Sequence, residues 1–206
     1  ALKAQSFKAM VQEGISYLSK EKGLLAIFVF FFVFMMSGEG LNVLLYPFFE
    51  NHPTLTVNHY AWLISFITAG RLIGGLLHYI FKVPIHLRYA VAAMVYFSLN
   101  ILNAILLLVP YWMMLGVQVM SGILSINSFN IRMSSVQSYV PSEKRGRING
   151  FYHILVALGM IIGRLFAGTM GEFFEYTHII IGMSTVGMIA FFVFIHGNRK
   201  HVSAVY

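Results

Sequence analysis

The sequence contains no cysteine and few charged residues. Without cysteine, neither a disulfide framework nor a thiolate metal site can form. Only 10% of the 206 residues are charged and 58% are hydrophobic, whereas soluble domains carry roughly 25% charged residues. The mean hydropathy of +0.76 points the same way. The composition excludes an ordinary water-soluble domain and predicts an integral membrane protein.

Apolar runs of the length needed to cross a bilayer, about 20 residues, recur along the chain. A proline, Pro110, separates the third run from the fourth and ends what would otherwise be one very long helix. We therefore expect an all-α membrane protein with six transmembrane helices, at 23–45, 59–81, 86–109, 111–131, 147–171 and 177–196.

The chain divides into three expected parts: residues 1–21, a helical bundle at 22–196, and a cytoplasmic tail at 197–206. Residues 2–20 show apolar side chains at helical spacing, which predicts an amphipathic helix lying in the membrane interface. The side chains that form this stripe are Phe7, Met10, Val11, Ile15 and Leu18. An ordinary soluble helix is the alternative. The chain begins with Ala1 rather than Met, which we interpret as a fragment or trimmed domain.

The basic residues alternate from side to side in a way that predicts topology. Apart from Arg71 and Arg164, every Lys and Arg lies before the first run, after the sixth, or between runs two and three or four and five, with Arg88 and Arg147 at the very start of runs three and five. The opposite loops hold Glu50, Glu172 and Glu175 and no basic residue. By the positive-inside rule both termini are cytoplasmic, and the expected location is the bacterial cytoplasmic membrane. The net charge of +7 is then topological, so nucleic acid is not an expected partner; the lipid bilayer is.

The two remaining arginines stand in similar phrases, GRLIGG at 70–75 and GRLFAG at 163–168. A charge in hydrocarbon costs about 2.5–3.5 kcal/mol on insertion scales, so it normally faces a partner or a water-filled cavity. Each phrase falls in the second run of a triplet, and the triplets enter the membrane from opposite sides. This predicts two inverted three-helix repeats, an architecture of secondary transporters.

Several segments resemble the C-terminal half of a major facilitator superfamily (MFS) transporter. The sequence VPSEKRGRING at 140–150, leading into 158–168, is similar to the junction of the family's tenth and eleventh spans. GRLIGG is similar to the eighth span, and KGLL at 22–25 to the start of the seventh, as in many bacterial drug-efflux members. The resemblance implies a partner, an N-terminal six-helix half, upstream in the same chain or in another subunit. Tyr79 stands where the family's cytoplasmic motif carries an aspartate, so the role of that motif is not carried over.

Glu39 is the only acidic residue inside an apolar run. Removal from water favours the protonated carboxyl group, whereas a nearby arginine favours the ionised one. We predict that Glu39, Arg71 and Arg164 take part in proton coupling or substrate recognition. The alternatives are that Glu39 forms a structural ion pair with either arginine or lies near the outer interface, and that the arginines make structural bonds between helices.

Polar side chains at steps of three and four residues follow one face of the fourth run. A polar stripe in a membrane helix faces protein or water, so we predict cavity lining, with helix–helix hydrogen bonding as the alternative. The predicted lining residues are Asn42, Gln118, Ser121, Ser125 and Ser128, and those predicted for the cytoplasmic gate or loop are Arg132, Arg145 and Arg147. Asn103 is assigned to packing. The phenylalanine-rich stretch 28–34 is expected to face lipid, or alternatively an apolar substrate.

The sequence shows neither G-x-S-x-G nor H-E-x-x-H, and no paired carboxylates within a span. We therefore expect no enzyme activity, no metal and no cofactor. The predicted function is the C-terminal half of a proton-coupled secondary transporter that moves small, fairly apolar molecules by alternating access, most simply as an exporter. The alternatives are a nutrient or metabolite importer, a six-helix intramembrane enzyme and a stand-alone homodimer.

Overall fold

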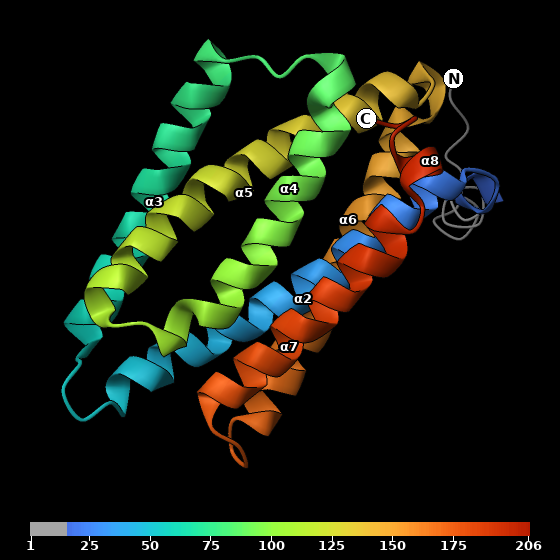
Figure 1. Cartoon of the computed structure of the whole chain (residues 1–206). Helices are drawn as coiled ribbons and strands as arrows, with labels where there is room; N and C mark the ends of the chain where they lie inside the picture. The colour runs from blue at the N-terminus through green and yellow to red at the C-terminus, as the bar shows by residue number, and fades with distance from the viewer. Residues whose placement is uncertain (1–15) are drawn as a thin grey trace, which may run out of the picture.

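The computed structural model describes residues 16–206, and this part of the chain consists of helices joined by short connections, without strands (Figure 1). The long helices are α2 (Lys22–Glu50), α3 (Val57–Ile80), α4 (Ile85–Ile105), α5 (Tyr111–Tyr139), α6 (Ser142–Met170) and α7 (Tyr176–Ala190). A 3-10 turn, Leu106–Leu108, extends α4; a π-helical segment, Phe191–His196, extends α7; and a short helix α8, Arg199–Val202, follows. Within residues 16–206, six helices are long and apolar enough to span a membrane. The prediction of an all-α protein with six spans is confirmed.

The helices extend beyond the apolar runs that predicted them. α5 continues to Tyr139 and α6 begins at Ser142, because hydropathy detects only the part of a helix that lies in hydrocarbon. The short break between them contains Pro141, which has no backbone N–H to donate. The predicted interfacial helix at 2–20 falls mostly outside the described residues. Within it, residues 16–20 are helical and Leu18 is buried in the bundle.

The helices form two groups, with α2, α6 and α7 in one and α3, α4 and α5 in the other (Figure 1). α2 packs mainly on α6 and α7, α5 packs mainly on α3 and α4, and α4 also contacts α7. If α2, α3 and α4 are exchanged with α5, α6 and α7 in that order, the α2–α6 contact becomes α5–α3 and the α2–α7 contact becomes α5–α4, while the α4–α7 contact is unchanged. All of these contacts are present. The packing is compatible with two inverted repeats, which remain a prediction.

Glycines mark the closest approach within each of the two main pairings. A Cβ added at Gly70 of α3 would collide with the carbonyl oxygen of Val119 on α5, and one at Gly163 of α6 with the carbonyl oxygen of Met36 on α2. Only a residue without a side chain permits such contact between helix backbones. Both Gly-Arg phrases therefore sit where two helices cross.

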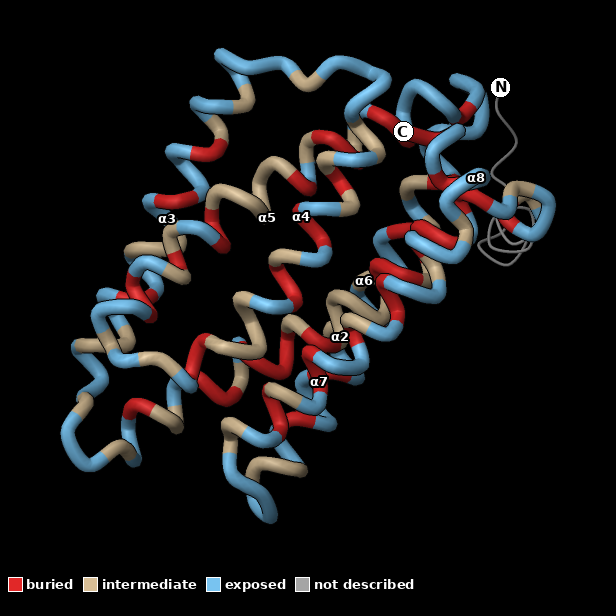
Figure 2. Tube along the Cα trace, in the orientation of Figure 1, coloured by how far each residue is buried: buried red, intermediate tan, exposed pale blue. Residues whose placement is uncertain are grey.

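The burial pattern separates a central helix from two open ones (Figure 2). α2 is the most buried of the six spans, whereas α3 and α6 are the most exposed. Large apolar side chains project from these two helices, including Leu72 on α3 and Leu165 on α6, each about two-thirds exposed. In a membrane such faces contact lipid or another helical bundle.

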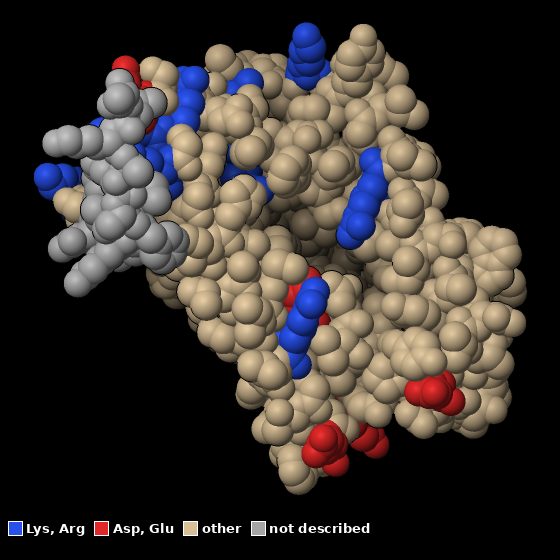
Figure 3. All heavy atoms as spheres, turned by 180° about the vertical axis from the view of Figure 1, so that it is seen from behind, with Lys and Arg blue, Asp and Glu red and all other residues tan. Residues whose placement is uncertain are grey.

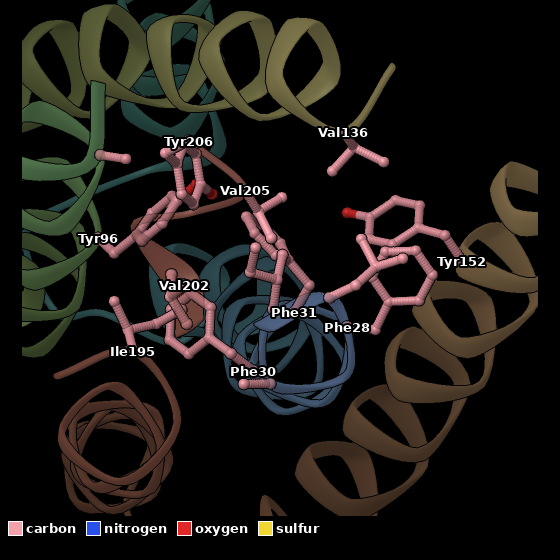
Figure 4. Packing of buried hydrophobic residues seen from close by; sticks show 14 of the residues in the cluster. Phe28, Phe30, Phe31, Tyr96, Val136, Tyr152, Ile195, Val202, Val205 and Tyr206 are labelled. Carbon is pink, nitrogen blue, oxygen red and sulfur yellow. The ribbon is translucent and has the colours of Figure 1, made fainter. Parts of the chain in front are cut away.

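An aromatic cluster fills one end of the bundle (Figure 4). Phe28, Phe30 and Phe31 of α2 are buried there, and the ring of Phe31 contacts those of Tyr96 and Tyr152. The expectation that the phenylalanine-rich stretch 28–34 faces lipid is therefore wrong for these three residues. α2 occupies the centre of the fold, so its aromatic side chains meet rings of α4, of α6 and of the segment after α7 instead of lipid.

The last residues of the chain complete this cluster. Val202, Val205 and Tyr206 are buried, and the Tyr206 hydroxyl hydrogen-bonds the hydroxyl of Tyr96 (Figure 4). Burial raises the pKa of the Tyr206 hydroxyl well above its usual range, so this group stays neutral at physiological pH. Residues 199–206 are therefore part of the packed structure.

Candidate functional site

A cavity of about 400 Å³ opens between α2, α3, α4 and α5. Its lining is mixed: apolar side chains such as Phe34 and Leu99 alternate with polar ones. Six of the residues singled out in the sequence line it, namely Glu39, Asn42, Arg71, Gln118, Ser121 and Ser125. The cavity thus combines one acidic and one basic side chain with amide and hydroxyl groups, in a space large enough for a small molecule.

The charges on the molecular surface are separated along the bundle (Figure 3). Most of the Lys and Arg side chains seen in this view lie at one end, and most of the Glu side chains lie at the other. A hollow lies between these ends, and only a few charged side chains stand beside it. The separation follows the alternation of basic and acidic loops in the sequence.

Glu39 is held by two neighbours. Its Oε2 accepts a hydrogen bond from Nε of Arg164 at 2.8 Å, which is also an ion pair, and its Oε1 accepts a longer bond from Nδ2 of Asn42 at 3.4 Å. The Glu39 side chain is only 10% exposed, whereas that of Arg164 is 58% exposed. The carboxylate is therefore sheltered, and its counter-ion reaches it from a more open position on α6.

The crossing of α2 and α6 explains this pair. Gly163 touches the backbone at Met36, which brings the next residue on α6, Arg164, close to the following turn of α2. Glu39 lies on that turn, three residues after Met36 and on the same helix face. One interpretation of the sequence was that Glu39 forms a structural ion pair with Arg164 or Arg71. In the structure, Glu39 pairs with Arg164.

Arg71 has a different environment although its local sequence is similar to that around Arg164. Gly70 touches the backbone at Val119 of α5, but the residue three positions after Val119 is Gly122, which itself lies against the α3 backbone. Among the described residues, no carboxylate lies within ion-pair distance of Arg71. Arg71 is exposed and lines the cavity.

The polar stripe of α5 divides into two parts. Gln118 and Ser121 are buried and line the cavity, as does the half-buried Ser125, whose hydroxyl donates to the carbonyl of Gly122 at 2.9 Å. Ser128 is buried as well, but it lies further along the helix and is not part of the cavity wall. Arg132 lies one turn beyond Ser128.

Arg132 was predicted for the cytoplasmic gate or loop, and a gating role remains a prediction. It lies inside α5 and is only 6% exposed, with its guanidinium carbon 4.6 Å from the ring centre of Phe31 and 4.3 Å from that of Tyr152. Its Nε has no hydrogen-bond partner among the described atoms. Cation–π contacts of this kind stabilise a buried guanidinium, and they tie α5 to α2 and α6.

The two other predicted gate arginines lie near the start of α6. Nε of Arg145 donates to the carbonyl of Val140 at 2.9 Å, closing the break between α5 and α6. Arg147 is exposed, close behind Arg145 on the same helix. Their place at the end of the bundle agrees with the predicted position, while a gating role remains a prediction.

Sequence reasoning missed two polar residues of the cavity, Thr68 and Asn103. Thr68 lies three residues before Arg71 and therefore on the same helix face, a signal that was available. Asn103 was assigned to packing, and that assignment is wrong because its side chain borders the cavity. Its position depends on how α4 is turned against α5, which local sequence does not report.

Comparison with known proteins identifies the family of this chain. The family model described as the Major Facilitator Superfamily matches residues 23–205, nearly all of the six-span bundle. The chain belongs to the major facilitator superfamily. No match to the chain was found among the curated proteins or the solved structures. Membership of the superfamily implies an integral membrane transporter, and the six helices found within residues 16–206 fit a six-helix MFS half.

Proposed function

We propose that the chain is the C-terminal half of a proton-coupled MFS exporter of small, fairly apolar molecules. The observation that carries the proposal is the position of Glu39, the only acidic residue inside one of the apolar runs. It borders the polar cavity and is paired with an arginine on another helix. A carboxyl group that lines the substrate cavity and also joins two helices is suited to couple proton binding to a change in helix packing.

The proposed coupling runs through the Glu39–Arg164 pair. When Glu39 is ionised, its attraction to Arg164 holds α2 and α6 together near the middle of the bundle. Protonation removes the negative charge, so the pair keeps at most a neutral hydrogen bond, roughly half as strong as a charge-assisted one. The α2–α6 contact then loosens and Arg164 becomes free for other partners. Each proton that enters or leaves thereby changes the relative stability of two arrangements of the same helices.

The substrate would occupy the cavity beside this pair. Gln118 and Ser121 offer hydrogen-bonding groups, and Phe34, Ile67 and Leu99 offer apolar surface. The exposed faces of α3 and α6 would contact the N-terminal half, against which this bundle would rock as a rigid body. Both termini would be cytoplasmic, because the basic loops lie on their side of the membrane.

The test is transport by the Glu39→Gln variant. The full-length transporter would be reconstituted into vesicles with an imposed pH gradient, and the accumulation of fluorescent apolar dyes would be followed. We expect the variant to bind dye and exchange it across the membrane but to lose accumulation driven by the gradient. Glu50→Gln, which alters an exposed carboxylate at the end of α2, is the matched control. Undiminished uphill transport by Glu39→Gln contradicts the coupling role.

Arg71 favours one second candidate, an importer of an anionic nutrient or metabolite. Its guanidinium is exposed at the cavity and no described carboxylate neutralises it, so a substrate anion would find a ready partner there. The same vesicles separate the two candidates. Uptake of small carboxylates in the direction of proton flow, without dye export, would support the importer.

A further inference from the structure

A second hollow, of about 290 Å³, lies at the basic end of the bundle between the α3–α4 turn and α5. We call it the basic hollow. It is lined by His78, Tyr79 and Lys82, by Arg88 in the first turn of α4, and by Asn130 and Ser134 of α5. We propose that the basic hollow binds the phosphate of an anionic phospholipid headgroup, with Lys82 and Arg88 as its contacts.

The charge of the hollow supports an anionic ligand. No acidic side chain lines it, and no described carboxylate lies within ion-pair distance of Lys82 or Arg88. At this end of the bundle, Glu21 accepts a hydrogen bond from Tyr139 at 2.6 Å and Glu143 accepts one from Ser142 at 3.3 Å. The positive end of the α4 dipole, at its first turn, adds to the attraction for an anion.

One wall of the hollow is fixed in place. Nδ1 of His78 hydrogen-bonds Oδ1 of Asn127 at 3.0 Å, and Nδ2 of Asn127 donates to the carbonyl oxygens of Ile123 at 2.8 Å and Gly74 at 3.4 Å. These bonds join the end of α3 to α5. Arg88 is half-buried rather than free in solvent. Arg88 is therefore carried by a packed helix, and Lys82 lies in the short turn that joins α3 to α4.

The surroundings of the hollow favour a lipid over a free anion. Tyr79 is 82% exposed, and the neighbouring Ile80, Phe81 and Ile85 are between 65% and 72% exposed. At the end of a membrane span, such side chains lie among headgroups and upper acyl chains, where aromatic residues are enriched. Basic pockets between spans recognise anionic headgroups. A phosphate that carries acyl chains satisfies both the charge and the apolar surface, whereas inorganic phosphate satisfies only the charge.

The test uses the full-length transporter and phosphatidylglycerol, with phosphatidylcholine as the zwitterionic comparison. Lipid binding would be titrated by native mass spectrometry for the parent protein and for Lys82→Gln/Arg88→Gln. Loss of two charges that each contribute near an anionic headgroup predicts a fall in affinity for the tightest phosphatidylglycerol of about thirtyfold. The variant Lys82→Arg/Arg88→Lys keeps both charges and should retain most of the binding.

The matched control is Arg199→Gln/Lys200→Gln, which removes two exposed basic groups at another basic segment of the chain. An equal loss of affinity in the control and in the hollow variant would show general attraction to negative charge and overturn the proposal. Displacement of phosphatidylglycerol by millimolar inorganic phosphate would overturn the lipid assignment in favour of a free anion. These measurements involve neither transport nor Glu39, so they stand apart from the proposed function.

Discussion

The α2–α6 and α3–α5 crossings use the same backbone device and place different side chains around it. In each, a glycine followed by an arginine presses against a carbonyl of the neighbouring helix, at Met36 and at Val119. Three residues further along, α2 carries Glu39 and α5 carries Gly122. Arg164 is consequently paired, whereas Arg71 lines the cavity without a described carboxylate partner.

The difference shows that the repeated Gly-Arg motif determines how closely two helices pack, whereas the neighbouring helix determines whether the arginine has a charged partner. Close contact requires only small residues, so both crossings can keep it. Pairing requires a carboxylate on the right turn, and only α2 supplies one. The predictions below test whether the two crossings have the same close packing and differ in having an ion pair.

The largest loss of stability is expected from changing the glycines that both crossings have in common. Gly70→Val and Gly163→Val each place a side chain against a backbone carbonyl, which cannot move without shifting a helix. Overpacking typically costs about 1–3 kcal/mol, and we expect both variants at or above the top of that range. Thermal unfolding of the full-length transporter in detergent measures this.

Neighbouring glycines provide the controls for these variants. A Cβ added at Gly75 or Gly168 meets nothing within 4 Å, so Gly75→Val and Gly168→Val should lower the melting temperature far less. Similar shifts in all four variants would mean that helix propensity, and not the crossing, determines the cost.

A smaller loss of stability is expected from changing the arginines, of which one is paired with a carboxylate and the other is not. Arg164→Gln leaves the sheltered Glu39 carboxylate without its cation and should cost about 1–2 kcal/mol, less than a fully buried pair because Arg164 is largely exposed. Arg71→Gln should change the free energy of unfolding by less than about 0.5 kcal/mol. Double-mutant cycles with Glu39→Gln should give a coupling energy of about 1 kcal/mol for Arg164 and none for Arg71. Equal coupling would remove the distinction.

The smallest effect concerns the second neighbour of Glu39. Asn42→Ala removes a 3.4 Å bond to the carboxylate and should cost about 0.5 kcal/mol, the low end for a hydrogen bond. Ser125, three residues after Gly122, bonds only within its own helix, so Ser125→Ala should be close to neutral. Chemical unfolding with both variants in parallel would reveal the contrast, and a larger effect at Ser125 would contradict it.

Much of the fold follows from the sequence, because span length, apolar composition and the breaking effect of Pro110 act locally. The polar cavity was partly predictable for the same reason: Gln118, Ser121 and Ser125 share one face of a helix. Local pattern failed at Phe28, Phe30 and Phe31. An apolar side chain looks the same in sequence whether it meets lipid or another helix, and only the central position of α2 buries it.

The sequence by itself determined that this is a six-span membrane protein with its basic residues toward one end, since hydrocarbon tolerates only long apolar helices. It also determined that Glu39, Arg71 and Arg164 stand within the spans. Only the tertiary structure decided which arginine neutralises Glu39, that Arg132 lies among aromatic rings, and that Asn103 reaches the cavity. Those outcomes depend on which helices touch and how each is turned, and contacts between residues distant in the chain leave no local periodicity to read.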